Sequence, residues 1–363
     1  MTVMIALDLA PAHQEPIDTG PHLPWLELLS VESFIGGDAR RGRGHSFFPV
    51  GQRRSKMQPL ILPVLLASLW TVCTRAGDWC YQSQFTCDHQ CNGPDKWNHA
   101  NSNCGGKYQS PINIVTRKTL TDERLTPFQF NNYQQIFRGT IKNNGHTVVV
   151  GVPHLSTISG GGLPSTYKAV QFHLHWGKNG GPGSEHTIDG EQYPMELHIV
   201  HMKSQYDDLT TALADQEGVA VLGFFYEKSN SANRKYDPII NSLRSIKATN
   251  SNTSLLSVSL TQLIPSEQNL TAYYRYKGSL TTPGCTEAVI WTLFENPIPL
   301  SMDQLRAFSE LKFHDGNPMV ETFRPVQPLN GRQVFRSGSA VILASSALLV
   351  TAIATALGLS QPN

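Results

Sequence analysis

A strict alternation of polar and hydrophobic residues over 171–176 constrains the fold of this chain most strongly. The segment is Gln-Phe-His-Leu-His-Trp. Side chains of a β-strand point to opposite faces of the sheet in turn, so a strand here places Gln171, His173 and His175 on one face. The Phe, Leu and Trp side chains share the other face, which we expect to pack into a hydrophobic core. The pattern therefore predicts a strand with one polar face and one buried face.

A second segment, 196–200, has a related pattern. It is Glu-Leu-His-Ile-Val, so Glu196 and His198 share one face of a strand. The 22 residues between His175 and His198 contain turn signals, which predicts that the two strands are antiparallel neighbours. We then expect His198 to lie opposite the pair formed by His173 and His175.

Three histidines on one face of a sheet indicate a metal site. A catalytic zinc site has three protein ligands and keeps one position for water, and imidazole is a common ligand. We therefore interpret His173, His175 and His198 as ligands of Zn²⁺. Two histidines on a strand can also be no more than a solvated polar face, and it is the third histidine that favours the metal. Gln171 and Glu196 are each expected to accept the outer N–H of a ligating imidazole.

Other segments predict a mostly β fold. Short β-branched or aromatic runs, separated by Gly, Pro, Asn and Ser clusters, predict strands over 147–152, 169–176, 193–202, 219–226 and 288–294. Helical signals are fewer. The best candidates are 236–246 and 301–308, with Ser301 as an N-cap. Together these signals predict one large sheet with peripheral helices.

The N-terminal part contains the pattern of a secretory signal. The hydrophobic run 60–73 follows three basic residues, and its length of about 14 residues is short for a membrane span of roughly 20. Met57 precedes the run. We therefore interpret 57–76 as a signal peptide and 1–56 as an upstream extension, either disordered or an artefact of the gene model. A genuine disordered leader is the alternative.

The C-terminal part contains a second hydrophobic segment, 340–359. Small residues precede it and no basic cluster follows it, which favours a glycosylphosphatidylinositol (GPI) anchor signal over a transmembrane helix. We expect attachment at Ser337, with 330–331 as a fallback, and removal of 338–363. The mature protein is then one domain over 77–337, large enough for a substantial core.

Cysteines and glycosylation motifs agree with secretion. One of the six cysteines, Cys73, lies in the signal, and the other five are Cys80, Cys87, Cys91, Cys104 and Cys285. A secreted chain is expected to pair most of them, and the odd number leaves one thiol over. Asn252 and Asn269 each begin an N-glycosylation motif.

Composition excludes some classes of function. Hydrophobic residues make up 40% and charged residues 16%, as in an ordinary globular protein. The formal net charge is +1, so no broad basic surface is implied and we expect no nucleic-acid partner. The helical His-Glu-x-x-His motif of zinc metalloproteases does not occur in the sequence, which argues against that class of zinc hydrolase.

Several motifs that occur in order resemble the α-class carbonic anhydrases. They are QFHLHWG at 171–177, SEHT at 184–187, ELHIVH at 196–201 and GSLTTPGC at 278–285, with further matches at 109–114 and 144–146. The resemblance spans roughly 78–332. It implies the α-carbonic anhydrase fold, which is mostly β and has a single large twisted, mainly antiparallel sheet with short peripheral helices. It also implies zinc-dependent, reversible hydration of CO₂ to bicarbonate and a proton.

The resemblance implies a role for each matching residue. His173, His175 and His198 match the zinc ligands. Thr281 matches a hydroxyl that orients the attacking hydroxide and donates its own proton to Glu185. His146 matches the proton shuttle, a role that suits a pKa near the ordinary value of about 6.5.

Further residues match the walls of the family's cleft. Those that match the substrate-binding wall are Thr281, Thr282, Val200, Val221, Leu280, Val289 and Trp291. Tyr81, Asn144 and Thr282 match residues that order water on the path to the shuttle. Gln171 and Glu196 match the partners of the ligating histidines. Val149 stands where many cytosolic relatives carry Asn.

The terminal segments and the early cysteines resemble the membrane-anchored, type-four branch of the family. That branch implies disulfides Cys80–Cys91 and Cys104–Cys285, whereas Cys87 departs from its pattern and could compete with Cys91. It also implies a monomer on the extracellular face of the plasma membrane, held there by a lipid anchor and associated with bicarbonate transporters. The alternative is a catalytically silent relative that acts as a binding ectodomain. The complete set of ligands with Glu185 and Thr281 favours the enzyme.

Overall fold

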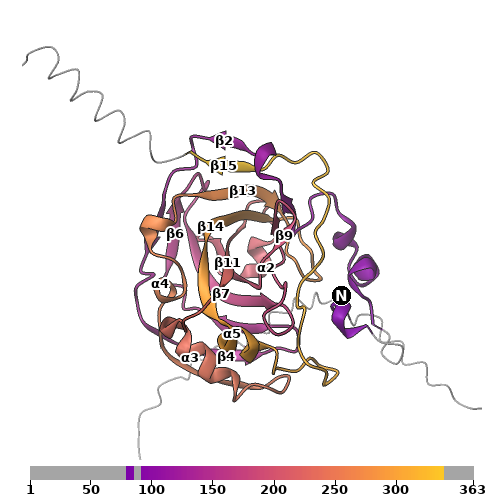
Figure 1. The fold of residues 1–363 in the computed structure, drawn as a ribbon. Coiled ribbons are helices and arrows are strands. Elements are labelled where there is room, and N and C mark those ends of the chain that lie inside the picture. Colours follow the sequence, from indigo (N-terminus) through magenta and orange to yellow (C-terminus); the bar gives the residue numbers. More distant parts are fainter. Residues whose placement is uncertain (1–78, 86–90, 339–363) are drawn as a thin grey trace, which may run out of the picture. The chain divides into compact units, whose positions relative to one another are not determined.

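The computed structural model describes residues 79–85 and 91–338. Within these ranges the strands form one 12-stranded sheet and one three-stranded sheet, and short helices lie around the outside (Figure 1). The prediction of a mostly β fold with one large sheet is confirmed.

The large sheet consists mainly of antiparallel pairs. Its strands are β2 (Leu120–Asp122), β3 (Phe128–Asn131), β4 (Phe137–Asn143), β5 (Val148–Gly151), β6 (Thr157–Gly160), β7 (Tyr167–Trp176), β10 (Met195–Lys203), β11 (Val219–Ser229), β12 (Asn252–Val258), β13 (Tyr273–Gly278), β14 (Val289–Ser301) and β15 (Phe335–Ser337). They follow the order β12-β4-β5-β7-β10-β11-β14-β13-β15-β2, and β6 pairs with both β7 and β3. Two pairs in the sheet, β11 with β14 and β15 with β2, are parallel.

The remaining elements are short. The small sheet contains β1 (Asn113–Ile114), β8 (Thr187–Ile188) and β9 (Glu191–Gln192). The α-helices are α1 (Trp97–Ala100), α2 (Leu209–Ala212), α3 (Asp237–Leu243), α4 (Leu260–Leu263) and α5 (Met302–Phe308). The 3₁₀ helices are Gln82–Gln84, Pro94–Lys96, Ser102–Gly105, Thr116–Lys118, Arg234–Tyr236 and Glu267–Asn269.

The predicted strands and helices correspond to β5, β7, β10, β11, β14, α3 and α5. Strand β14 continues beyond the predicted end to Ser301, because after an irregularity at Phe224/Tyr226 it pairs again with the end of β11. Helix α5 begins where Ser301 predicts: the Ser301 hydroxyl accepts from the N–H of Gln304, whose side-chain oxygen accepts from the N–H of Ser301. This reciprocal pair satisfies two donors at the start of the helix.

The alternation in β7 separates a hydrophobic face from a polar one. Phe172, Leu174 and Trp176 are 0%, 0% and 1% exposed and belong to the larger hydrophobic cluster. A second cluster includes Val200 of β10 and Val221 of β11. The prediction that the Phe, Leu and Trp side chains pack into the core is confirmed.

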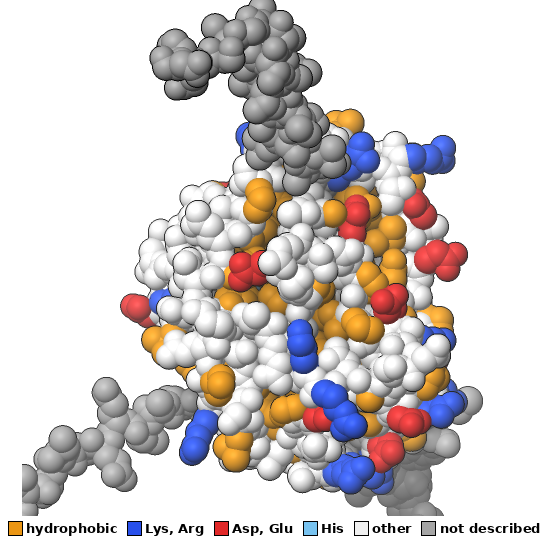
Figure 2. Space-filling model, turned by 60° about the vertical axis from the view of Figure 1, so that its left-hand side comes forward, with side chains coloured by type: hydrophobic (Ala, Val, Ile, Leu, Met, Phe, Trp, Pro, Cys, Tyr) orange, Lys and Arg blue, Asp and Glu red, His pale blue; other side chains and the backbone are white. Residues whose placement is uncertain are grey.

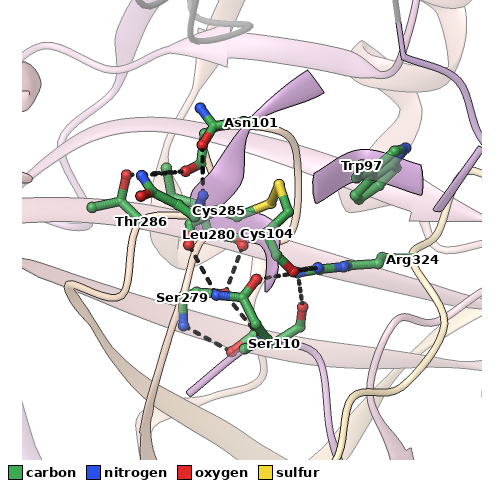
Figure 3. The surroundings of a disulfide bond; sticks show 12 residues. Trp97, Asn101, Cys104, Ser110, Ser279, Leu280, Cys285, Thr286 and Arg324 are labelled. Atoms are coloured by element: carbon green, nitrogen blue, oxygen red, sulfur yellow. Dashed lines mark hydrogen bonds between the residues drawn. A yellow bond between two sulfur atoms is a disulfide. The ribbon is translucent and has the colours of Figure 1, made fainter. Parts of the chain in front are cut away.

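Disulfides tie the N-terminal segments to the sheet. The bonds Cys80–Cys91 and Cys104–Cys285 are the two pairs that the resemblance implies. Cys87 lies outside the described residues. Figure 3 shows Cys104–Cys285 beside Arg324, whose guanidinium donates to the carbonyl oxygens of Cys104 and Ser110. The loop that follows β13 is therefore fastened to the segment around residue 104.

The terminal segments with the patterns of processing signals lie almost entirely outside the described residues. The extension 1–56, the signal peptide 57–76 and the tail from 339 onward lie outside the described residues. In 79–85 and 91–338, no helix is long and apolar enough to cross a membrane. Ser337 is described and ends β15, where its hydroxyl donates to the Thr271 carbonyl at 2.8 Å.

Neither sign of charge dominates the face of the molecule in Figure 2. Lys and Arg side chains are interspersed with Asp and Glu, and hydrophobic side chains show between them. This mixture of signs on the face shown is consistent with the net charge of +1.

Candidate metal centre

The pairing of β7 with β10 brings three histidines together. His198 of β10 lies directly opposite His173 of β7, as the sequence predicts, and His175 is two residues further along β7. The ring centroids of His173 and His198 are 5.1 Å apart, and those of His175 and His198 are 4.7 Å apart. One ring nitrogen of each lies within 4.8 Å of the others, which is the spacing of a candidate metal site.

Each of the three imidazoles has a hydrogen-bond partner for one nitrogen. His173 Nδ1 lies 3.0 Å from Gln171 Oε1, and His198 Nε2 lies 2.7 Å from Glu196 Oε1. The structure thus places Gln171 and Glu196 in the positions that the alternation predicts. His175 Nδ1 donates to the carbonyl oxygen of Thr322 at 2.6 Å, a partner that the sequence analysis missed.

These hydrogen bonds determine which nitrogens face the centre. The nitrogens that face inward are Nε2 of His173, Nε2 of His175 and Nδ1 of His198. His173 Nε2 and His198 Nδ1 are 3.2 Å apart, and His175 Nε2 is buried with no hydrogen-bond partner among the described residues. When the outer nitrogen is a donor, the inner nitrogen of a neutral imidazole carries a lone pair.

The three imidazoles are suited to a zinc ion. Burial lowers the pKa of all three, that of His175 to about 3, so they are neutral at physiological pH. Three neutral imidazoles with converging lone pairs are the ligand set of a catalytic zinc site. The residues present therefore fit the metal that the sequence analysis assigns to them.

Glu196 is the centre of a buried network behind His198. Its Oε1 also lies 2.7 Å from His186 Nδ1, and its Oε2 accepts the backbone N–H groups of Glu185 and His186. Burial by itself would raise the pKa of Glu196, but the neighbouring His186 and His198 hold it well below its ordinary value. The carboxylate therefore stays ionised. The sequence analysis missed His186, although it lies inside one of the recognised motifs.

Glu185 lies on another side of the three histidines. Its Oε2 is 3.3 Å from His175 Nε2, and its Oε1 accepts the backbone N–H of Arg324 at 2.9 Å. Burial raises the pKa of Glu185, while hydrogen bonding by the Thr281 side chain and by the Arg324 N–H opposes that shift. Thr281 lines the same cleft as the histidines. The structure thus brings Glu185 and Thr281 together with the three histidines.

A cleft opens above the histidines. Its lining consists of Tyr81, Asn144, His146, Thr147, Val149, Gln171, His173, His175, His198, Val200, Leu209, Val221, Leu280, Thr281, Thr282 and Trp291. Val289 is the one member of the expected substrate wall that does not line it. Its side chain is 1% exposed and packs in the second hydrophobic cluster with Val200 and Val221. Leu209 of α2 was not expected in the lining, because it lies outside every motif that carries the resemblance.

His146 lies at one side of this cleft, stacked on an aromatic ring. Its ring centroid is 3.9 Å from that of Trp79, and the two planes differ by 11°. Asn144 Oδ1 accepts the backbone N–H of His146 at 3.0 Å and so holds the loop. The expected pKa near 6.5 is wrong for this position, because burial, and then the charge of His314, lower the pKa of His146 to about 3.

Comparison with known proteins gives consistent similarities. Residues 92–338 match the family model of the eukaryotic-type carbonic anhydrases. Carbonic anhydrase 4 of Rattus norvegicus is 40% identical over 282 residues, which cover 77% of this chain and 90% of that protein. Carbonic anhydrase 15 of Mus musculus is 37% identical over 303 residues, which cover 80% of this chain and 92% of that protein. Carbonic anhydrase 12 of Homo sapiens is 37% identical over 279 residues, which cover 74% of this chain and 77% of that protein.

Proposed function

The chain belongs to the eukaryotic-type carbonic anhydrase family and is a carbonic anhydrase, and on this premise we propose that it holds zinc at its three histidines and works at the extracellular surface of the plasma membrane. The observation that carries the zinc proposal is the convergence of three neutral imidazole nitrogens. Each imidazole is oriented by an acceptor at its other nitrogen. The acceptors are Gln171 for His173, the Thr322 carbonyl for His175 and Glu196 for His198.

The metal and its ligands would supply the nucleophile. When bound, zinc lowers the pKa of a coordinated water molecule so that hydroxide is available near neutral pH, a chemistry for which carbonic anhydrase is itself the standard example. His173, His175 and His198 would contribute three ligand nitrogens and leave a coordination position open toward the cleft.

Thr281 and Glu185 would orient the attack on CO₂. A carboxylate can only accept a hydrogen bond, so the Thr281 hydroxyl donates its proton to Glu185 and presents its lone pairs to the cleft. An attacking oxygen that donates its own proton to Thr281 then has a lone pair directed at the substrate. The contribution of the pair is orientation, which lowers the barrier by restricting the reacting groups to a productive geometry.

The substrate would sit against the apolar side of the cleft. Val200, Val221 and Trp291 are 2–3% exposed and line it, and Leu280 lies beside them. CO₂ carries no charge and no net dipole, so an apolar wall accommodates it without leaving a polar group unpaired. Bicarbonate is charged and is better solvated by water than by this wall, which favours its departure.

The proton would leave through His146, which also lines the cleft. Tyr81, Asn144 and Thr282 also line the cleft and offer polar groups to water between Thr281 and His146. Burial raises the pKa of Tyr81, so its hydroxyl stays protonated, and its buried oxygen has no hydrogen-bond partner among the described residues.

Several observations support an extracellular location. The two disulfides are typical of an oxidising compartment. Asn252 and Asn269 are exposed, so both glycosylation motifs are accessible. We propose cleavage of a signal peptide over 57–76 and attachment of a GPI anchor at Ser337. A monomer anchored in this way could supply bicarbonate to a transporter in the same membrane.

Stopped-flow CO₂ hydration tests the zinc proposal. The secreted, anchor-free enzyme should be active, lose activity with a strong chelator and regain it with one equivalent of zinc. Protein that contains no zinc and is inactive would support the silent binding ectodomain instead.

A phosphatidylinositol-specific phospholipase tests the anchor. Treatment of intact cells that express the full chain should release activity into the medium. Activity that stays with the cells would favour a true membrane span over 340–359. N-terminal sequencing of the released protein should begin near residue 77, and a mature chain that retains residues before Met57 would contradict the signal assignment.

A further inference from the structure

A second histidine lies beside His146 and outside the cleft described above. The ring centroids of His146 and His314 are 4.8 Å apart, and the planes meet edge to face at 70°. His314 is exposed and does not belong to the cleft lining. The two rings therefore connect the side of the cleft with the solvent.

Two contacts direct a particular edge of His314 toward the loop that carries His146. Nδ1 of His314 lies 3.1 Å from the Thr249 hydroxyl, which leaves Nε2 as its free nitrogen. Gly145, with φ +87°, precedes His146, and a Cβ atom on it would lie 2.1 Å from both Cε1 and Nε2 of His314. The absence of a side chain at Gly145 thus allows the Nε2 edge of His314 to rest against the loop that carries His146.

His146 is only partly exposed, and its Nδ1 edge is shielded from bulk water. Its Nδ1 is buried and has no hydrogen-bond partner among the described residues, and Trp79 covers one face of its ring. A charged group in such a place is poorly solvated, so His146 releases a proton readily. It needs a nearby acceptor to receive that proton.

We propose that His314 is the outer group of a two-histidine proton relay, which takes the proton from His146 and passes it to buffer in the solvent. This inference rests on the proposed role of His146 as the exit from the cleft. In each cycle protonated His146 transfers one proton to neutral His314, directly or through water, and His314 then transfers it to a buffer base. Both imidazoles return to the neutral form, so the cycle is balanced.

The electrostatics of the pair agree with a single shared proton. Charge on His314 lowers the pKa of His146, so the two rings disfavour being protonated together. Two other ionisable groups on the adjoining segments have partners of their own. Asp315 Oδ2 accepts from Gln84 at 3.3 Å, and Lys247 pairs with Glu310 at 2.7 Å.

Stopped-flow CO₂ hydration by H314A at low and high buffer concentration tests the relay. Proton transfer limits kcat when buffer is scarce, whereas kcat/KM reports the steps up to CO₂ hydration. We expect kcat at low buffer to fall by about tenfold. This loss is smaller than the ~10²-fold or more that follows removal of a typical general acid–base group, because buffer can also accept the proton without the relay. The value of kcat/KM should not change, and added imidazole buffer should restore kcat.

H99A, which removes another exposed histidine, is the matched control and should behave as the wild type. H146A and the double variant H146A/H314A should have the same kcat at low buffer, because His314 acts through His146. A wild-type kcat for H314A at every buffer concentration would overturn the relay, as would equal losses in kcat and kcat/KM without rescue by imidazole. A wild-type enzyme without zinc-dependent hydration would instead refute the proposed function.

Discussion

Glu196 Oε1 accepts a hydrogen bond from Nε2 of His198 at 2.7 Å, and this bond turns Nδ1 of His198 toward the other two histidines. The remaining two rings present Nε2 to the centre, so the three ligands are not equivalent. The ionised carboxylate also makes the His198 imidazole a better electron donor. Zinc affinity at this site should therefore depend on the charge of Glu196 as well as on the three ligands.

The variant E196Q should weaken zinc binding. Glutamine keeps the shape of the side chain but removes the negative charge that holds His186 and His198 in place. We expect the zinc dissociation constant to rise by about 10- to 100-fold, measured by competition with a chelator of known affinity. E191Q, at an exposed position of β9, should have no effect. An E196Q enzyme with wild-type affinity would show that the carboxylate has no influence on the metal.

The variant T281V should separate catalysis from metal binding. Valine has nearly the shape of threonine but cannot relay a hydrogen bond to Glu185, so the attacking oxygen loses its orientation. We expect kcat/KM for CO₂ hydration to fall by about 10²-fold, while zinc content stays at one equivalent. T126V, at an exposed position of the loop before β3, is the control. Loss of zinc together with activity in T281V would mean that Thr281 acts on the site's structure instead.

The two disulfides should differ in their contribution to stability. Cys104–Cys285 closes a loop with a sequence separation of 181, whereas the separation in Cys80–Cys91 is 11. Loop-closure entropy predicts that the free energy of unfolding falls by about 5 kcal/mol without the first and by about 3 kcal/mol without the second. Denaturant unfolding of C104A/C285A and C80A/C91A measures both. Equal losses would contradict the dependence on loop length.

His201 should make the protein less stable in acid. It is fully buried on β10, with Tyr133 and the Ala220 carbonyl as its hydrogen-bond partners, and burial lowers its pKa to about 3. The unfolded chain, with an ordinary histidine pKa of about 6.5, binds a proton between about pH 3 and 6.5 that the folded chain excludes. Stability therefore rises with pH across this window, by up to about 1.4 kcal/mol per pH unit, and His201 has no effect on the slope above it.

H201Q tests this slope. The free energy of unfolding of the variant, measured by denaturant titration at several pH values, should depend less steeply on pH than that of the wild type below about pH 6.5. H99Q changes a histidine that is exposed in the folded state and should leave the slope unchanged. A slope in H201Q identical to that of the wild type would contradict the burial argument.

The alternation of side chains along two strands is sufficient to predict much of the metal centre. A strand places every second residue on one face whatever surrounds it, so the local pattern groups His173 with His175 and pairs Gln171 and Glu196 with the ligands. A similarly local rule identifies Ser301 as the cap of α5. In each case the property belongs to a few neighbouring residues of the backbone.

Tertiary packing decided the features that depend on distant segments. The Thr322 carbonyl that orients His175 is separated from it by 147 residues, and no periodic pattern marks a backbone acceptor. Burial, and then the charge of His314, lower the pKa of His146 to about 3, and the rings that contact it, Trp79 and His314, are far apart in the sequence. Val289 is packed inside the second hydrophobic cluster although its motif matches the cleft wall. The burial of a side chain and its pKa depend on which distant segments come into contact in the fold. The order of residues along one strand does not determine those contacts.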